Sequence, residues 1–287
     1  MKKVLLIGNR LSCLKSLENN SKYEIVAVFA DRGSLLENYL KEKGVSYMPF
    51  SKEDKESVFS QLFELEYDIL VSNGCPLILP ASKIEEQGKM LLNTHPTYLP
   101  HLRGATPLNG VFYKGYNFVG ATTHYISDRI DAGNIVYQEK VDISEDIDQG
   151  LVYYISFKME EIVFKKALEI LESANYKYEG TSFNTADGCY FNRTKEKQTI
   201  DFINDDIETC IRKIKSFGIK SQGCEAIIEG KNYRIFSCER IINPFLLNSF
   251  ESVPAGAIAL KYDDKMIIKI KDGMIKLTQY QNSWGGV

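Results

Sequence analysis

The sequence lacks long hydrophobic runs, closely spaced cysteines and a large charge of one sign. No apolar stretch approaches the roughly 20 residues of a membrane-spanning helix, and the run after Met1 stops at Asn9, too short for a secretory signal. Even the nearest of the six cysteines, such as Cys210 and Cys224, are too far apart for a CxxC redox or zinc pair. These absences predict a cytoplasmic protein with no membrane segment, reduced thiols and no metal site.

The net charge is also small. Lysine and arginine number 35 and aspartate and glutamate 38, so the formal charge of −3 argues against a broadly basic nucleic-acid binder. With 15 Phe and 17 Tyr the chain has enough apolar area to fold, and its 287 residues predict about two domains. Histidine is scarce, so any imidazole chemistry must use His95, His101 or His124.

The first half of the chain alternates β-rich and helical segments. Residues 34–43 are the clearest helix, with Ser34 as its N-cap and Gly44 as its stop. Strands are expected around it at 3–7, 24–29, 47–48, 68–72 and 89–93. This alternation predicts an α/β fold with a Rossmann-like, mostly parallel sheet, which binds ligands at the carboxyl ends of its strands.

The second half changes in character. A strand pair at 118–126 and 135–142 precedes a long amphipathic helix at 147–173. One more helix is expected within 200–218, and the short alternating segments after it fit a small antiparallel barrel or sandwich. We therefore predict an α/β domain at 1–175, a polar linker at 176–198 and a β-rich domain at 199–287.

The most informative motif is Asn93-Thr94-His95-Pro96, which directly follows a predicted buried strand. Residues two apart on a strand face the same side, so Asn93 and His95 point together past the strand end. An amide can stabilise an oxyanion, and an imidazole can take or relay a proton. A histidine that merely ends a strand and caps a turn is the alternative.

A second feature is the stretch ISDRIDAG at 126–133. A carboxylate at Asp131 could orient the His95 imidazole, as the third member of a catalytic triad does. Spacing alone leaves open that Asp128 and Asp131 are ordinary turn residues.

Together, the stretches NTHPTYLP (93–100), RGATPL (103–108) and IDAGNI (130–135) resemble the folate-dependent formyltransferase family. Its members formylate methionyl-tRNA, glycinamide ribonucleotide or nucleotide-linked amino sugars. Thr97 stands where the family pattern has Ser, and Ile130 where it has Leu. The resemblance covers residues 1 to about 175, and the rest more weakly resembles the OB-like C-terminal domain of the tRNA and some sugar members.

The resemblance implies that Asn93, His95 and Asp131 are the catalytic residues, with 10-formyltetrahydrofolate as the formyl donor and a primary amine as the acceptor. The amine would attack the formyl carbon while Asn93 and protonated His95 stabilise the oxyanion. Asp131 would hold His95 and assist proton transfer. Which residue takes the amine proton stays open.

Two loops are expected to bind the pterin of the folate. The loop at 70–80 can form the wall of a pocket for a flat aromatic ligand, although an ordinary strand-to-helix loop with core leucines is the alternative. We interpret Cys75 within it as a packing residue. The expected folate contacts are Ser72, Gly74, Pro76, Leu77, Ile78 and Leu79 in this loop, and Asp128 and Ile130 before the catalytic aspartate.

The acceptor is expected at the first strand-to-helix turn and at the loop after the Asn-x-His motif. A helix N-terminus favours phosphate, whereas the absence of GxGxxG argues against a dinucleotide site. A solvated turn is an equal alternative for the first turn. The expected contacts are Gly8, Asn9, Arg10, Thr97, Arg103, Gly104 and Thr106.

Two observations bear on the class of acceptor. The tRNA enzymes usually carry a basic, Gly-rich insertion after the second strand, whereas here Ala30 to Gly33 lead straight into the next helix. Residues 200–287 contain 12 basic and 11 acidic residues, which gives little attraction for a large RNA. Both favour a nucleotide-linked amino sugar of polysaccharide biosynthesis, with methionyl-tRNA second. Two other functions stay open: a folate binder without activity, and a hydrolase that deformylates the folate. Whether the chain forms a homodimer stays open as well.

Overall fold

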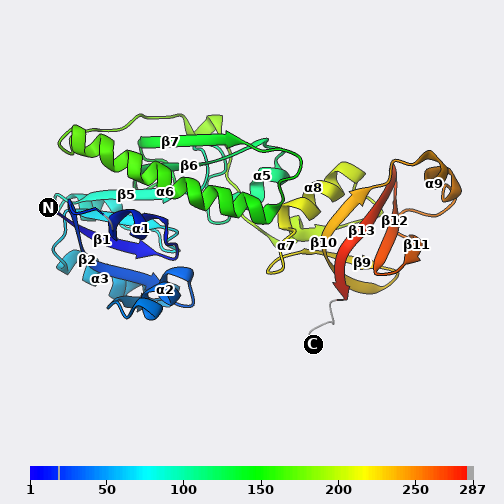
Figure 1. Cartoon of the computed structure of the whole chain (residues 1–287), viewed down its shortest axis with the longest axis horizontal. Coiled ribbons are helices and arrows are strands. Elements are labelled where there is room, and N and C mark those ends of the chain that lie inside the picture. Colours follow the sequence, from blue (N-terminus) through cyan, green and yellow to red (C-terminus); the bar gives the residue numbers. More distant parts are fainter. Residues whose placement is uncertain (19, 283–287) are drawn as a thin grey trace. The chain divides into compact units, whose positions relative to one another are not determined.

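The computed structural model describes residues 1–18 and 20–282 and divides into two compact units (Figure 1). Unit 1 contains Met1–Pro107, Phe118–Asp142 and Tyr154–Tyr190. Unit 2 contains Leu108–Asn117, Ile143–Tyr153 and the chain from Phe191 on. Neither unit is a continuous stretch, since Leu108–Asn117 and Ile143–Tyr153 belong to unit 2 but lie between segments of unit 1.

Unit 1 is built on a mostly parallel sheet in the order β3-β2-β1-β4-β5-β6-β7, which confirms the predicted fold class. Neighbours from β3 to β5 run parallel, whereas β6 is antiparallel to both β5 and β7. The strands are β1 (Lys2–Gly8), β2 (Tyr23–Asp31), β3 (Met48–Phe50), β4 (Ile69–Asn73), β5 (Met90–His95), β6 (Phe118–Tyr125) and β7 (Ile135–Asp142).

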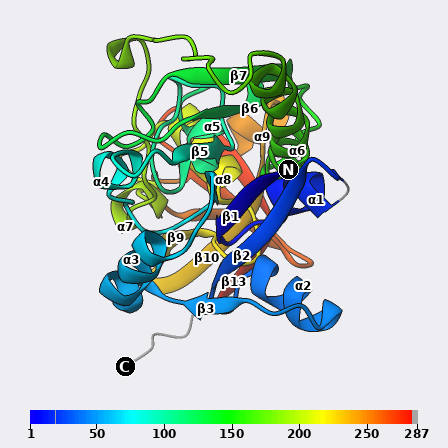
Figure 2. The ribbon, with the colours of Figure 1, turned by 90° about the vertical axis from the view of Figure 1, so that its left-hand side faces the viewer.

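Helices cover both faces of this sheet (Figure 2). One face packs on α1 (Ser12–Glu18), α2 (Leu35–Lys43) and α6 (Gln149–Ser173), and its apolar core includes Leu14, Leu40 and Phe164. The other face packs on α3 (Lys55–Glu64) and α4 (Ala81–Glu85). Since both faces are covered, β1 is a continuous apolar run, fully buried from residue 4 to residue 7.

The helix predicted at 34–43 is confirmed as α2 together with both of its end signals. Ser34 caps it by accepting a hydrogen bond from the backbone N–H of Glu37. Gly44 ends it in the left-handed conformation, with φ 65°.

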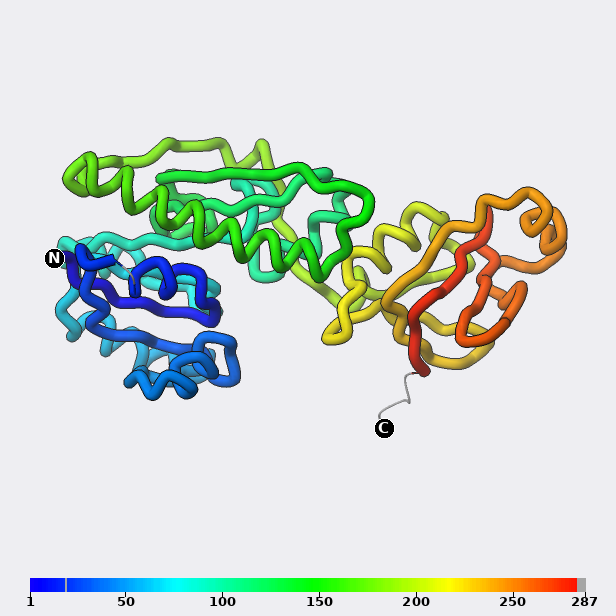
Figure 3. The backbone as a smooth tube through the Cα atoms, viewed as in Figure 1, coloured from blue at the N-terminus to red at the C-terminus, as the bar shows by residue number. Residues whose placement is uncertain are grey.

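The first part of the segment expected as a linker, up to Tyr190, belongs to unit 1. After α6 the chain turns back and runs beside β7, as Figure 3 shows, and Thr181 and Ile135 exchange backbone hydrogen bonds of 2.8 and 2.9 Å. Further along, Tyr190 forms a β-bridge with Arg103. This segment contains η3 (Thr185–Asp187) and precedes α7 (Lys195–Gln198).

Unit 2 is β-rich, as predicted, with a sheet in the order β11-β12-β13-β10-β9-β8. Its strands are β8 (Thr199–Ile200), β9 (Cys224–Ile228), β10 (Lys231–Arg240), β11 (Ile258–Tyr262), β12 (Lys265–Ile270) and β13 (Gly273–Asn282). All neighbours are antiparallel except β8 and β9. Its helices are α5 (Gly110–Tyr113), α8 (Ile207–Phe217) and α9 (Pro244–Ser249), together with α7. Within the described residues, no helix has both the length and the apolar composition that crossing a bilayer requires.

Candidate active site

The candidate site is a cavity of about 380 Å³ in unit 1, at the carboxyl ends of β1, β4 and β5. The loop after β4 forms one wall, and the end of β5 and the β6–β7 loop supply polar groups that include Asn93, His95 and Asp131. Tyr190, from the segment of unit 1 that follows α6, also lines it. A parallel sheet places several strand ends at one edge, and this is where the sequence predicted a ligand.

Most of the predicted site residues line this cavity. They are Asn9, Arg10, Ser72, Gly74, Pro76, Leu77, Ile78, Leu79, Asn93, His95, Gly104, Thr106, Ile130 and Asp131. The cavity also takes in Cys75, which the sequence analysis interpreted as packing, and Lys52, which it did not single out.

Four predicted contacts do not line the cavity, and each has another role. Thr97 is buried and donates its hydroxyl to the backbone oxygens of His101 and Leu102, at 2.9 and 3.1 Å. The Arg103 guanidinium donates to the carbonyl of Thr185 at 3.3 Å. Thr97 therefore shapes the loop after β5, and Arg103 connects that loop to the segment of unit 1 that follows α6.

The other two are Gly8 and Asp128. A Cβ atom on Gly8 would overlap the carbonyl oxygen of Asn73, so glycine lets the ends of β1 and β4 approach closely. Asp128 accepts hydrogen bonds from the hydroxyl and the backbone N–H of Ser82, the latter at 3.3 Å. Its carboxylate therefore joins the β6–β7 loop to α4.

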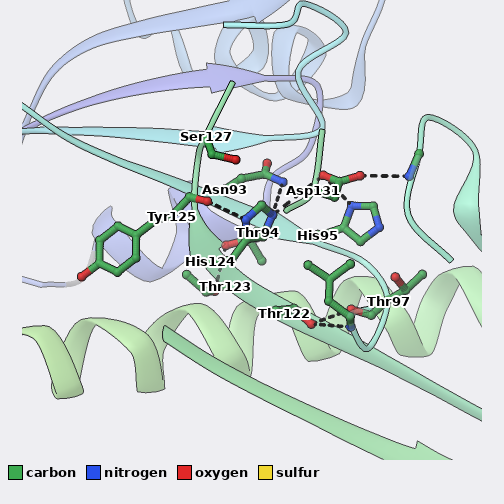
Figure 4. A network of polar contacts seen from close by, with 12 residues as sticks. Asn93, Thr94, His95, Thr97, Thr122, Thr123, His124, Tyr125, Ser127 and Asp131 are labelled. Atoms are coloured by element: carbon green, nitrogen blue, oxygen red, sulfur yellow. Dashed lines mark hydrogen bonds and ion pairs between the residues drawn. The ribbon is translucent and has the colours of Figure 1, made fainter. Parts of the chain in front are cut away.

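Asn93, His95 and Asp131 come together at the cavity, the first two from β5 and the third from the β6–β7 loop (Figure 4). His95 Nδ1 lies 3.5 Å from Asp131 Oδ1, and its Nε2 lies 3.0 Å from the carbonyl oxygen of Leu102. Both ring nitrogens thus face acceptors. A ring protonated on both nitrogens satisfies both contacts, and such a ring carries a positive charge into the site.

Asp131 is held as an anion. Burial disfavours its charge, but the imidazoles of His95 and His124 and a hydrogen bond from the Gly104 N–H hold the pKa of this carboxyl below its usual value. That N–H lies 2.9 Å from Oδ2. The backbone of Asp131 is left-handed, with φ 48°, a conformation that strains most side chains and is common at functional sites.

His124 is a site residue that the sequence reasoning missed. It lies on β6 directly opposite Asn93, and its Nε2 is 3.0 Å from Asn93 Nδ2. Its Nδ1 is 2.7 Å from the carbonyl oxygen of Tyr125, and Nε2 also lies 3.8 Å from Asp131 Oδ1. The strand was predicted, but its register against β5 was not. Only that register shows that His124 faces Asn93.

A buried ion pair fixes the turn that follows β1 at the edge of the site. Arg10 pairs with Glu160 of α6, which is fully buried and also accepts a hydrogen bond from the Ser12 hydroxyl at 3.1 Å. Burial raises the pKa of Glu160 even though Arg10 opposes that shift. The guanidinium also lies over the Phe157 ring, 5.0 Å from its centre. Two residues of α6, Glu160 and Phe157, therefore hold Arg10 in place. An anion bound in the cavity would contact the same guanidinium as Glu160 does.

Among the described residues, the site has no group of side chains suited to bind a metal ion. Over residues 1–18 and 20–282, no group of three or more His, Cys, Asp or Glu side chains could hold a metal ion. The burial of Cys75 raises the pKa of its thiol to about 12, so this cysteine is a poor nucleophile.

The chain matches known protein families along most of its length. Residues 2–168 match the family described as Formyl transferase, and residues 192–285 match Formyl transferase, C-terminal domain. It is 26% identical to the methionyl-tRNA formyltransferase of Caldicellulosiruptor saccharolyticus over 83% of this chain and 73% of that protein. It is 24% identical to that of Mycoplasma capricolum over 93% and 86%, respectively.

Solved structures share the fold. A sugar N-formyltransferase from a Shewanella species superposes with a TM-score of 0.66 at 19% identity, over 85% of this chain and all of that one. HypX from Aquifex aeolicus in complex with tetrahydrofolic acid superposes with a TM-score of 0.63 at 17% identity, over 98% of this chain. The chain spans less than half of the length of HypX, 44%.

Proposed function

The chain belongs to the formyl transferase family, whose formyl donor is a formyl-tetrahydrofolate, and on this premise we propose that it formylates the primary amine of a nucleotide-linked amino sugar. One observation supports this class of reaction: Asn93, His95 and Asp131 lie together at one cavity. An amide donor, a cationic imidazole and a carboxylate are the groups that acyl transfer to an amine needs.

The proposed reaction joins the amine nitrogen to the formyl carbon and then breaks the bond from that carbon to N10 of the folate. Asn93 donates an N–H to the oxyanion of the tetrahedral intermediate, and the positive charge of His95 stabilises it. The amine loses a proton and N10 of tetrahydrofolate gains one. The lowered pKa of Asp131 keeps its carboxylate ionised beside His95, where it can assist the proton transfer.

Folate binding is supported by the apolar rim of the cavity. Ile78 is 62% exposed and Ile130 is 42% exposed, although both are large and apolar. They lie on the two loops where the pterin is expected, and both line the cavity. An aromatic ring between them would cover apolar surface that is otherwise in contact with water.

The small acceptor is supported by the short β2–α2 connection and the near-neutral charge of residues 200–287. β2 ends at Asp31 and α2 begins at Leu35, which leaves no room for a basic insertion. Arg10 and Lys52 both line the cavity and give it two cations for an acceptor diphosphate. The Shewanella structure, a sugar N-formyltransferase, matches the fold along its whole length.

Methionyl-tRNA is the second candidate. Matches to both the N- and C-terminal families favour it, as does the coverage of 86% of the Mycoplasma capricolum methionyl-tRNA formyltransferase.

The test offers the full chain 10-formyltetrahydrofolate together with either a panel of amino-sugar nucleotides or aminoacylated initiator tRNA. We expect tetrahydrofolate release to depend on one of the sugar nucleotides, with an N-formylated product detected by mass. Formylation of the tRNA alone would replace the proposed acceptor with the second candidate. Equal release without any amine would instead indicate a deformylating hydrolase.

A further inference from the structure

The contact between His124 and Asn93 has a direction that the surrounding atoms determine. His124 Nδ1 lies 2.7 Å from the carbonyl oxygen of Tyr125, and a peptide carbonyl can only accept a hydrogen bond. Nδ1 must therefore carry a hydrogen. Burial lowers the pKa of His124 despite the opposing charge of Asp131, which favours the neutral ring. In a neutral ring protonated at Nδ1, the other nitrogen, Nε2, has a lone pair and no hydrogen.

That lone pair determines how the Asn93 carboxamide is oriented. Nε2 is 3.0 Å from the terminal group of Asn93, and it can accept only from an N–H. If the carboxamide were flipped, its oxygen would face the Nε2 lone pair, and two acceptors would repel each other. The amide nitrogen therefore points to His124. Since that nitrogen carries two hydrogens, the second is left for the cavity that Asn93 lines.

We propose that His124 is a positioning residue, which fixes the orientation of Asn93 so that an amide N–H, and not the amide oxygen, meets the developing oxyanion. The inference rests on the oxyanion role that the proposed function gives to Asn93. His124 also lines the cavity, but its proposed role is exerted through the hydrogen bond to Asn93. The antiparallel register of β5 and β6 makes this possible, because it places the two residues directly opposite each other on one face.

Nuclear magnetic resonance tests the hydrogen-bond direction without any substrate. Ring ¹⁵N chemical shifts distinguish a protonated nitrogen from one with a lone pair, and the chain has only three histidines to assign. The His124→Gln and His101→Gln variants identify the signals. We expect a hydrogen on Nδ1 of His124 and none on Nε2 at neutral pH. A hydrogen on Nε2 would overturn the proposal, because Asn93 would then turn its oxygen to His124.

Kinetics test whether His124 acts through Asn93. His124→Phe removes the acceptor, and we expect kcat to fall about 10- to 100-fold with a small change in the acceptor KM, since misplacing a catalytic group by about 1 Å has effects of this size. His124→Gln can still accept from Asn93, so it should retain more of kcat. In an Asn93→Ala background, His124→Phe should cause little further loss.

An equal loss of kcat from His124→Phe in both backgrounds would show a general structural role and overturn the proposal. So would an unchanged kcat in the single variant. His101→Phe, a change of the same type on the same unit, controls for the loss of a histidine. If no acceptor supports turnover, the proposed function fails, while the tautomer of His124 is still decided by the nuclear magnetic resonance experiment.

Discussion

At the scale of single residues, the site combines an imidazole, a carboxylate and an amide in a small volume. His95 is 5% exposed and Asp131 has a side chain that is 11% exposed, so water screens the electrostatic interaction between them little. The amide of Asn93 is hydrogen-bonded to His124, which is outside the proposed catalytic set. Each of these groups can therefore be tested separately.

Removal of Asn93 or His95 should affect the transition state more than substrate binding. We expect Asn93→Ala and His95→Ala to fold normally and to lose about 10²- to 10³-fold in kcat, with a much smaller change in the acceptor KM. Steady-state kinetics and circular dichroism of each variant measure this. A near-native kcat in both variants would contradict the proposed mechanism.

Asp131 should make stability depend on pH. Its pKa is lower in the folded chain than the ordinary value of 3.8, so its contribution is fully present above that value and is lost as pH falls toward the folded pKa. The free energy of unfolding of the native chain should thus fall between about pH 5 and pH 3 more steeply than that of Asp131→Asn. Urea unfolding at each pH measures it, and identical pH profiles would refute the assignment.

At the scale of elements, the cavity depends on two loops that approach closely, the one after β1 and the one after β4. Gly74 has φ 74°, and a Cβ there would overlap Asn9 Oδ1 and lie 2.9 Å from Arg10 Nε. The same Arg10 is held by Glu160 of α6, 150 residues further along the chain. An added methyl group at Gly74 would therefore push against a turn that cannot move freely.

We expect Gly74→Ala to lower the free energy of unfolding and to weaken folate binding. Gly88→Ala is the matched control, because Gly88 has φ 75° but nothing within 4 Å of an added Cβ. Both variants share a backbone strain of about 1–2 kcal/mol, so the excess loss in Gly74→Ala reports the clash between the loops. Urea unfolding and calorimetry with a folate measure it. Equal losses of stability and unchanged folate binding would contradict this account.

At the scale of the whole molecule, segments of the two units alternate along the chain. Leu108, Val111 and Phe112, from the first half of the sequence, are buried and belong to unit 2. Asn109 in the same segment donates from Nδ2 to Ser216 O and Gln222 Oε1, both at 2.7 Å. The first 190 residues therefore include pieces that need partners from further along the chain.

A fragment that ends at Tyr190 should consequently expose apolar surface around Phe112 and bind a hydrophobic dye more strongly than the full chain does. Its melting temperature should fall below the lowest transition of the full chain. Dye fluorescence and calorimetry measure both. A fragment as stable as the full chain, with no added dye binding, would show that residues 1–190 fold independently.

The amino-acid sequence by itself determined the α/β alternation, the helix from Leu35 to Lys43 with its caps, and the Asn93-His95 pair at a strand end. These follow from the period of apolar residues, from capping and from the alternation of side chains along a strand, all of which act between near neighbours. Only the tertiary structure decided that His124 faces Asn93, that Glu160 pairs with Arg10, and that Thr97 and Arg103 serve the loop and not the cavity. Such contacts depend on strand register and on packing between distant segments, which no local pattern specifies.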